Sequence, residues 1–408
     1  NLDSLSAGLQ AELRPYYVPP DDADSYLGAA AARKARITPL NTPTGWPYIS
    51  VSIAAQPEAT PALAARGARI HYESSSDTAA RQQAQWLAEA FEDAYPRFVA
   101  LLNRNVDQDV YVYVHPRITD KGVADMRVIN GAMRGRIYVR KGMNEQLSKA
   151  VLAHELFHVF QDYVGLDYSP DDEQWLMEAT AAWAEHYIYP DYNTEHEYLP
   201  QFFSNLDQSM ISGGSTGYTT YPWFLFVTQM LHYEGYVSDM LHDAVSQTAT
   251  SAVTEKPYFE AYFGQYALWN WNQDPARNYR DNPSFPGDPR GGESYDSVLY
   301  EQNRQYTGNI FVGPLAMLYN AMVISDSVDK IKFEFDAPST AGKRRQALVL
   351  INGAWTIEDW TGITERTFCR NRDEDRVDAV VLIASNAGTT DDYNENFRVD
   401  TRGRCLPS

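Results

Sequence analysis

The order of hydrophobic and polar residues divides the chain into a region that mixes helices with strands and a later region of short strands. Alternating or strand-forming runs predict strands over residues 68–72, 109–115 and 135–140. Apolar residues at helical spacing predict helices over residues 78–102, 144–163 and 174–189. Strands and helices in this order are typical of an α+β domain.

More helix is predicted over residues 222–233, 236–247 and 258–271, and Pro222 is well placed in a first helical turn. Residues 272–300 are rich in Asn, Asp, Pro and Gly and predict a linker or a long surface loop. Beyond residue 309, short β-rich runs separated by Gly and Asn turns predict a small β-sandwich, with strands at 330–335, 345–351, 377–384 and 396–399.

The start of the chain has weak periodicity and many Pro and Ala residues. It predicts an extension packed on the next domain, with one short helix over residues 24–34. The patterns together predict three parts: an N-terminal extension over residues 1–66, an α+β domain over 67–303 and a β-sandwich over 304–408.

Composition narrows the classes of protein that the chain can belong to. Hydrophobic residues make up 44% of its 408 residues, which is enough to build a core and excludes wholesale disorder. The net charge of −20 disfavours binding to nucleic acid or to anionic lipid. The longest apolar runs, such as 223–227 and 379–384, are far too short to span a membrane.

The chain has two cysteines, Cys369 and Cys405, and they do not form a C-x-x-C pair. A single disulfide in a secreted protein is the favoured interpretation, because it would tie the end of the chain to the last strands. The alternative is two unrelated buried thiols. We therefore expect an extracellular location.

One motif in the predicted helix at 144–163 carries chemistry. Residues 154–158 read His-Glu-Leu-Phe-His, which is H-E-x-x-H. Four residues is about one helical turn, so His154 and His158 lie on one face and can bind the same Zn²⁺ ion. Glu155 is next to the first ligand and can take a proton from a water molecule.

A third ligand is suggested by Glu178, which follows His158 by 20 residues. It lies in the predicted helix 174–189, whose neighbouring residues are Leu, Met, Ala and Trp. A carboxylate in such surroundings is costly unless it is paired or bound to a metal. Glu185, two turns further on, lies on the same face and is a candidate to orient a ligand histidine.

An H-E-x-x-H helix followed by a glutamate in a second helix resembles the gluzincin metallopeptidases, the thermolysin-like and aminopeptidase-like group. The resemblance spans about residues 68–270 as a layout. It implies that His154, His158 and Glu178 are zinc ligands and that Glu155 is the general base. The strand at 135–140 also resembles the edge strand that binds the substrate backbone in that group.

Two departures limit the resemblance to the wider group. Thermolysin-like enzymes have an acidic residue four positions after the ligand glutamate, and here that residue is Ala182. The segment 131–135 lacks an exopeptidase signature. A less familiar family of secreted gluzincins is therefore implied.

Such a site also needs a donor that stabilises the oxyanion. Tyr218 and Tyr221 follow a Gly-rich segment and are the principal candidates, and His232 is a further one. The chain has 28 tyrosines, so the alternative is that these two are ordinary core or surface residues.

These residues predict a gluzincin-like α+β domain with a mixed sheet and active-site helices, followed by a β-sandwich. We expect a secreted zinc peptidase, and an endopeptidase because no acidic cluster is placed to bind a free amino group. Two alternatives stay open: a peptidase that requires a glycan on its protein substrate, and a non-catalytic binding or adhesion protein with a vestigial metal motif. The Asp and Asn residues at 272–288 could bind Ca²⁺ through their oxygen atoms; the alternative is that they form a solvated loop.

Overall fold

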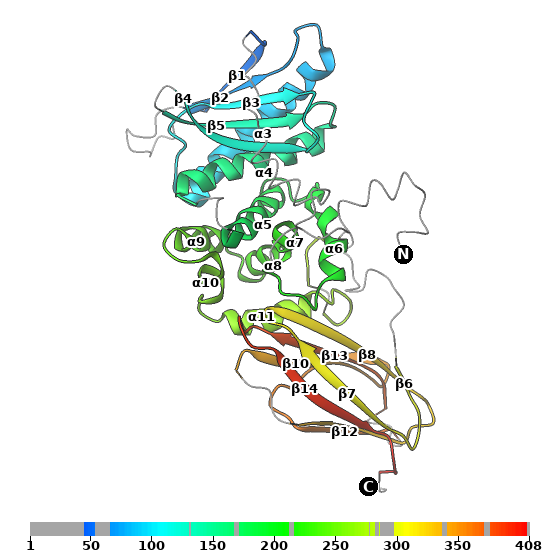
Figure 1. Cartoon of the computed structure of the whole chain (residues 1–408). Coiled ribbons are helices and arrows are strands. Elements are labelled where there is room, and N and C mark those ends of the chain that lie inside the picture. The colour runs from blue at the N-terminus through cyan, green and yellow to red at the C-terminus, as the bar shows by residue number, and fades with distance from the viewer. Residues whose placement is uncertain are drawn as a thin grey trace. The chain divides into compact units, whose positions relative to one another are not determined.

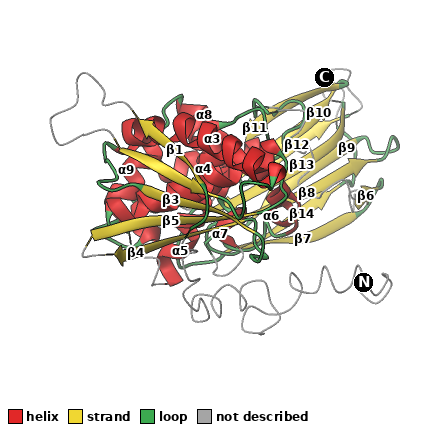
Figure 2. Cartoon of the chain, turned by 90° about the horizontal axis from the view of Figure 1, so that it is seen from above, coloured by secondary structure: helices red, strands yellow, loops and turns green. Residues whose placement is uncertain are grey.

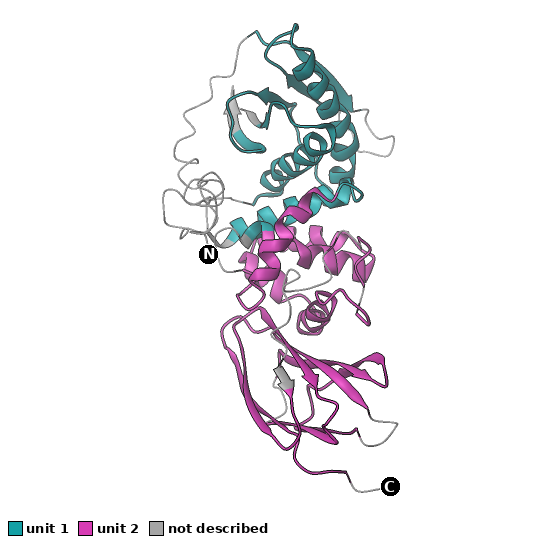
Figure 3. Cartoon of the chain, turned by 90° about the vertical axis from the view of Figure 1, so that its right-hand side faces the viewer, with its two compact units in different colours: residues 1–192, 213–218 teal, residues 193–212, 219–408 magenta. Residues whose placement is uncertain are grey.

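A computed structural model of the chain describes residues 45–53, 66–129, 132–166, 171–211, 216–276, 278–281, 285, 298–336, 341–370 and 376–405. Figure 1 shows the helices and strands along the chain. The chain forms two compact units, one from Asn1–Tyr192 with Gly213–Tyr218 and the other from Asn193–Ser212 with Thr219–Ser408 (Figure 3). The predicted boundaries at residues 66 and 303 stay predictions, and these units divide the chain at other positions.

The first unit contains a mixed five-stranded sheet in the order β1-β2-β3-β5-β4. Its strands are β1 (Tyr48–Ile53), β2 (Arg66–His71), β3 (Val110–His115), β4 (Gly122–Ile129) and β5 (Ala132–Arg140). The β2–β3 and β3–β5 pairs are parallel, and the β1–β2 and β4–β5 pairs are antiparallel. The expected mixed sheet is thus confirmed, and β1 adds a strand from within the predicted extension.

Three long helices of this unit match the predicted segments, namely α3 (Thr78–Leu102), α4 (Glu145–Val164) and α5 (Asp171–Ile188). The short α7 (Thr216–Thr219) follows later in the chain. Side-chain caps fix two of the helix starts: Asp77 accepts from the N–H of Ala80, and Asn144 accepts from the N–H of Leu147, both at 2.9 Å. Helix α4 ends at Gly165, whose φ of +108° suits a left-handed C-cap.

Helices α3 and α4 pack against each other and against one face of this sheet (Figure 2). Alternate residues of the central strands are fully buried on that face, among them Val112, Ile137 and Val139. Leu152 and Leu156 of α4 are also fully buried. Burying this apolar surface fixes α4 on the sheet, at about 25 cal/mol for each Å² removed from water.

The second unit begins with helices and continues into strands. Its helices are the 3₁₀ helix η2 (Thr194–Tyr198), α6 (Leu199–Ser204), α8 (Tyr221–Leu231), α9 (Gly235–Ala244), α10 (Ala249–Thr254) and α11 (Phe259–Trp269). Three of them, α8, α9 and α11, largely coincide with predicted helical segments, whereas α10 was not predicted. Tyr319 of the strand region donates a hydrogen bond to the carbonyl of Ala267 at 2.5 Å, which ties α11 to the neighbouring sheet.

The strands of this unit form two sheets, in the orders β11-β10-β13-β8-β6 and β12-β9-β14-β7. Their bounds are β6 (Val298–Tyr300), β7 (Gln305–Val312), β8 (Ala316–Ile324), β9 (Lys330–Phe335), β10 (Lys343–Ile351), β11 (Ala354–Asp359), β12 (Glu365–Cys369), β13 (Val377–Asn386) and β14 (Tyr393–Asp400). Their pairs are antiparallel except for β6–β8. A core that includes Phe333, Trp360 and Val380 joins residues from both sheets, as a sandwich requires.

Cys369 at the end of β12 forms the predicted disulfide with Cys405, with a Cα–Cα distance of 5.7 Å. The bond joins the segment that follows β14 to the sheet. The predicted pairing of the two cysteines is therefore confirmed.

None of the helices in the described part of the chain has the length and apolar character needed to cross a membrane. The helix predicted at residues 24–34 lies outside the described residues, as does most of the loop predicted at 272–300.

Breaking the disulfide should destabilise the second unit. The bond closes a loop with a sequence separation of 36, and loop-closure entropy for that length is worth about 3–4 kcal/mol. The double variant Cys369→Ala/Cys405→Ala should therefore unfold at a lower temperature in calorimetry. A reducing agent should lower the unfolding temperature of the unmodified chain to that of the double variant. An unchanged transition in both experiments would contradict this role.

Candidate metal site

Helices α4 and α5 lie side by side and carry the predicted ligand residues. His154 and His158 are one turn apart on α4, and their ring centroids are 4.9 Å apart. Both are almost fully buried, as is Glu178 on α5, which is 6% exposed. The apolar residues around them bury both helices in the protein interior. The three polar side chains therefore face each other away from solvent.

Three atoms converge in this cluster. Oε2 of Glu178 lies 3.4 Å from Nε2 of His154 and 3.5 Å from Nε2 of His158. A tetrahedral zinc ion with bonds of about 2.0–2.2 Å places neighbouring ligand atoms about 3.3–3.6 Å apart. The three side chains therefore fit one ion of this size, and this His-His-Glu group could hold a metal.

The other ring nitrogen of each histidine faces an acceptor. Nδ1 of His154 is 2.9 Å from Oε1 of Glu185, and Nδ1 of His158 is 2.7 Å from Oε1 of Gln161. An acceptor at Nδ1 favours a proton there, so Nε2 is the ring nitrogen that faces Glu178 and that a metal ion would bind. Glu185 thus lies where the sequence predicted it, in contact with a histidine of the cluster.

Gln161 is a residue that the sequence analysis missed. Its amide nitrogen donates to Oγ1 of Thr180 at 2.7 Å and to the carbonyl of Met177 at 2.9 Å, while its oxygen faces His158. This fully buried amide therefore holds α4, α5 and one imidazole in register. Its position three residues after His158, on the same helical face, is the signal that could have identified it.

Electrostatics in the cluster favour a cation. Burial would raise the pKa of Glu178, but the two histidines outweigh it and hold that pKa well below its usual range. Burial would lower the pKa of His154, but hydrogen bonds to Glu178 and Glu185 outweigh it and raise the pKa to about 10. Carboxylates thus surround both imidazoles, and a bound cation would be balanced by negative charge.

Glu155 follows the first histidine and lies against strand β4. A Cβ atom at Gly122 would come within 2.7 Å of Oε1 of Glu155, so the strand can approach this carboxylate only because residue 122 is glycine. Glu155 is buried, and burial is the largest cause of its raised pKa. A carboxyl group with a raised pKa is suited to take up and return a proton.

The expectation that residues 135–140 form an edge strand is wrong. They belong to β5, which pairs with β3 on one side and with β4 on the other. Among the described residues, β4 is the outermost strand at this side of the sheet. The sequence did not reveal β4 because Gly122 and Ala124, which face α4, are too small to give a clear apolar pattern.

Helix α7 brings two more residues to the cluster. A Cβ atom at Gly217 would lie 2.8 Å from Cβ of Glu178, so glycine is required where α7 meets α5. The ring of Tyr218 stacks on His154 with centroids 5.8 Å apart and planes 16° apart. The structure therefore places Tyr218, one of the predicted oxyanion donors, beside the histidine pair.

Tyr221, the other principal candidate, lies in the second unit. It is 0% exposed, and burial raises the pKa of its hydroxyl well above the usual value. His232 ends α8 and lies within hydrogen-bond distance of Arg280. The roles predicted for these two residues stay predictions.

In the described part of the chain, this His-His-Glu cluster is the one group of three or more His, Cys, Asp or Glu side chains that lie close enough together to hold a metal ion. The Ca²⁺ site suggested for residues 272–288 falls partly outside the described residues and stays a prediction.

Residues 75–258 match the model of a family of unknown function, DUF6055. The matched segment includes α4, α5 and every residue of the cluster. No curated protein matches the chain.

The cluster should bind one zinc ion per chain, because three ligand atoms converge on one position. Replacing His154 or His158 with Ala should weaken zinc binding by more than the roughly 10–100-fold typical of lost supporting residues. Competition titration with a chromophoric chelator measures both the number of zinc ions bound per chain and the affinity. His242→Ala in α9 is the matched control and should bind zinc normally. Equal affinity in all three variants would contradict the site.

Gln161→Leu should lower zinc affinity by about 10–100-fold, because Nδ1 of His158 loses its acceptor and the two helices lose their amide link. The same titration tests this, with circular dichroism to check the fold. A variant that is folded and binds zinc as tightly as the unmodified chain would remove Gln161 from the site.

Proposed function

We propose that this protein is a secreted zinc-dependent peptidase of the gluzincin type. The convergence of Nε2 of His154, Nε2 of His158 and Oε2 of Glu178 is the observation that carries the proposal. Two histidines and one glutamate are a ligand set found in zinc peptidases. Three protein ligands leave a coordination position open for solvent or substrate.

The choice of zinc rests on the donor set and its spacing. Imidazole nitrogens suit zinc, and the distances of 3.4 and 3.5 Å fit tetrahedral geometry. When bound, zinc acts as a Lewis acid that polarises a carbonyl group and acidifies water. Glu185 and Gln161 support this role, because they hold Nδ1–H of each histidine and keep Nε2 available.

Glu155 is the proposed general base. It is adjacent to His154 in the sequence and is buried beside β4 rather than exposed to bulk water. Its carboxylate would take a proton from the attacking water and return it to the leaving amine. Burial raises its pKa, and this brings the carboxyl group closer to the pH at which it must exchange protons.

An extended peptide is the proposed substrate. Strand β4 has no further strand beside it among the described residues, and peptides can add to such an edge through backbone hydrogen bonds. Gly122 and Glu155 meet at the start of this strand, so a bound backbone would pass close to the general base. We infer an endopeptidase, since main-chain recognition along a strand does not require a chain end.

Tyr218 is the proposed oxyanion donor. Its ring stacks on His154, and its half-buried position leaves part of the side chain accessible. A tyrosine hydroxyl can donate to the oxygen that becomes negative as water attacks the carbonyl. The proposed extracellular location is supported by the Cys369–Cys405 disulfide.

Glu155→Gln should lower peptide hydrolysis by about 10²–10⁴-fold while zinc stays bound, because the amide cannot accept the proton. The rate of hydrolysis is measured with an unstructured protein such as casein, and the zinc content of each variant is measured by elemental analysis.

Gly122→Ala is a second variant for the same question. Its methyl group would come within 2.6 Å of Cγ1 of Val151 and 2.7 Å of the Glu155 side chain, so α4 or Glu155 must shift there and turnover should also fall without loss of zinc. Full activity in Glu155→Gln would exclude Glu155 as the base. Zinc binding by the unmodified chain without hydrolysis of any protein substrate would favour a non-catalytic binding protein.

A further inference from the structure

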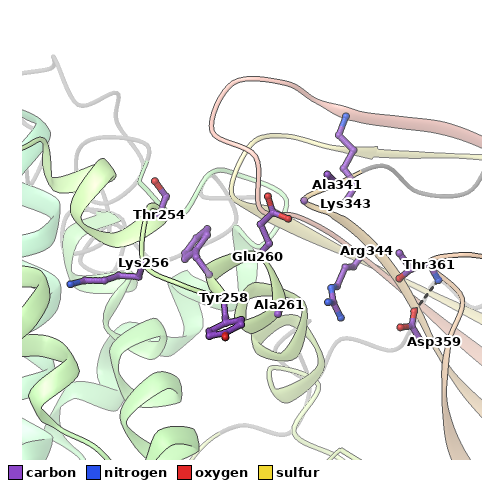
Figure 4. A pocket seen from close by; sticks show the side chains of 12 residues that line it. Thr254, Lys256, Tyr258, Glu260, Ala261, Ala341, Lys343, Arg344, Asp359 and Thr361 are labelled. Atoms are coloured by element: carbon purple, nitrogen blue, oxygen red, sulfur yellow. Dashed lines mark hydrogen bonds between the residues drawn. The ribbon is translucent and has the colours of Figure 1, made fainter.

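The second unit contains a pocket that is independent of the metal cluster. It has a volume of about 640 Å³ and lies where the end of α10 and the start of α11 meet strands β10 and β11. Figure 4 shows Tyr258 and Glu260 on its helical side and Arg344, Asp359 and Thr361 on its strand side. The walls are therefore mostly polar and carry charges of both signs.

Arg344 is the cation of this pocket whose guanidinium has no ion pair or hydrogen bond with another described residue. Within the described residues, no carboxylate lies within ion-pair distance of its guanidinium. The stem of Arg344 lies directly on α11, because a Cβ atom at Gly264 would come within 2.3 Å of its Cδ. A glycine in the helix thus provides the space that holds this side chain at the pocket.

The two lysines of the pocket are already engaged. Lys256 forms an ion pair with Asp243 at 2.5 Å, and Lys343 donates to the carbonyl of Asp392 at 2.7 Å. Figure 4 shows both lysine side chains extending away from the Arg344 guanidinium. Arg344 is therefore the group available to bind an anion, in a chain whose net charge is −20.

Tyr258 presents an aromatic ring to solvent at the same pocket. Its side chain is 74% exposed, and its φ of +67° is a backbone conformation that bulky residues rarely adopt. Because the ring is exposed, hydrophobic burial does not compensate for the unfavourable backbone conformation. Such positions are often kept because they place a side chain for binding.

We propose that this pocket binds a sugar that carries a carboxylate group, such as a uronic or sialic acid. Arg344 would bind the carboxylate through paired N–H groups, and the ring of Tyr258 would stack on the apolar face of the sugar. Glu260, Asp359 and Thr361 would accept hydrogen bonds from hydroxyl groups. The volume suits a ligand of one or two sugar rings.

The mixture of charges favours this ligand over an acidic peptide. A peptide with several carboxylates would be repelled by Glu260 and Asp359, which line the same pocket as Arg344. A sugar brings one carboxylate for Arg344 and several hydroxyl donors for the two carboxylates. An uncharged sugar would leave Arg344 without a partner.

The experiment is ligand-observed NMR and calorimetric titration of the full chain with N-acetylneuraminate and glucuronate, compared with galactose and acetate. The acidic sugars should bind at millimolar concentration, and galactose and acetate should bind more weakly. Arg344→Met should weaken acidic-sugar binding by about tenfold or more. Arg404→Met, at an arginine that is 81% exposed and paired with Asp329, should have no effect.

Tyr258 provides a second and independent test. Tyr258→Ala should weaken binding, whereas Tyr258→Phe should retain it. Tyr258→Gly should weaken binding and raise the melting temperature, because glycine adopts positive φ without strain. Equal binding of acetate and the acidic sugars, unchanged binding in folded Arg344→Met, or no binding of either acidic sugar would overturn the proposal.

Discussion

The contact between Glu178 and the two imidazoles of α4 is the interaction on which the site depends. A carboxylate buried among apolar side chains is costly unless positive charge or hydrogen-bond donors surround it. Here the histidine nitrogens lie 3.4 and 3.5 Å away, at the spacing that ligands of one ion adopt. The close packing of α4 against α5 follows from this requirement as much as from the apolar contacts between the helices.

The residues around this contact hold it in place from several directions. Glu185 and Gln161 fix the ring orientation of each histidine, and Gln161 also bonds to the helix that carries Glu178. Gly122 and Gly217 remove the side chains that would otherwise displace Glu155 and Glu178. Gly122 also makes room for Val151, so the same glycine lets strand β4 pack closely on α4.

Much of this arrangement could be predicted from the sequence, because periodicity reports which helix face is buried and H-E-x-x-H spacing reports one turn of a helix. Glu178 and Glu185 were identifiable as charges in an apolar helix. Strand β4 was not, because Gly122 and Ala124, on its helix-facing side, are too small to give a clear apolar pattern. Gln161 was missed because it carries no charge that marks it as unusual in a buried helix, although its position three residues after His158 places it on the same helical face.

The proposed zinc position can be located by anomalous scattering at the zinc edge, from crystals of the zinc-loaded full chain. We expect one peak per chain, about 2.0–2.2 Å from Nε2 of His154, Nε2 of His158 and a carboxylate oxygen of Glu178. A peak bound by other residues, or no peak between α4 and α5 in crystals that contain stoichiometric zinc, would contradict this position.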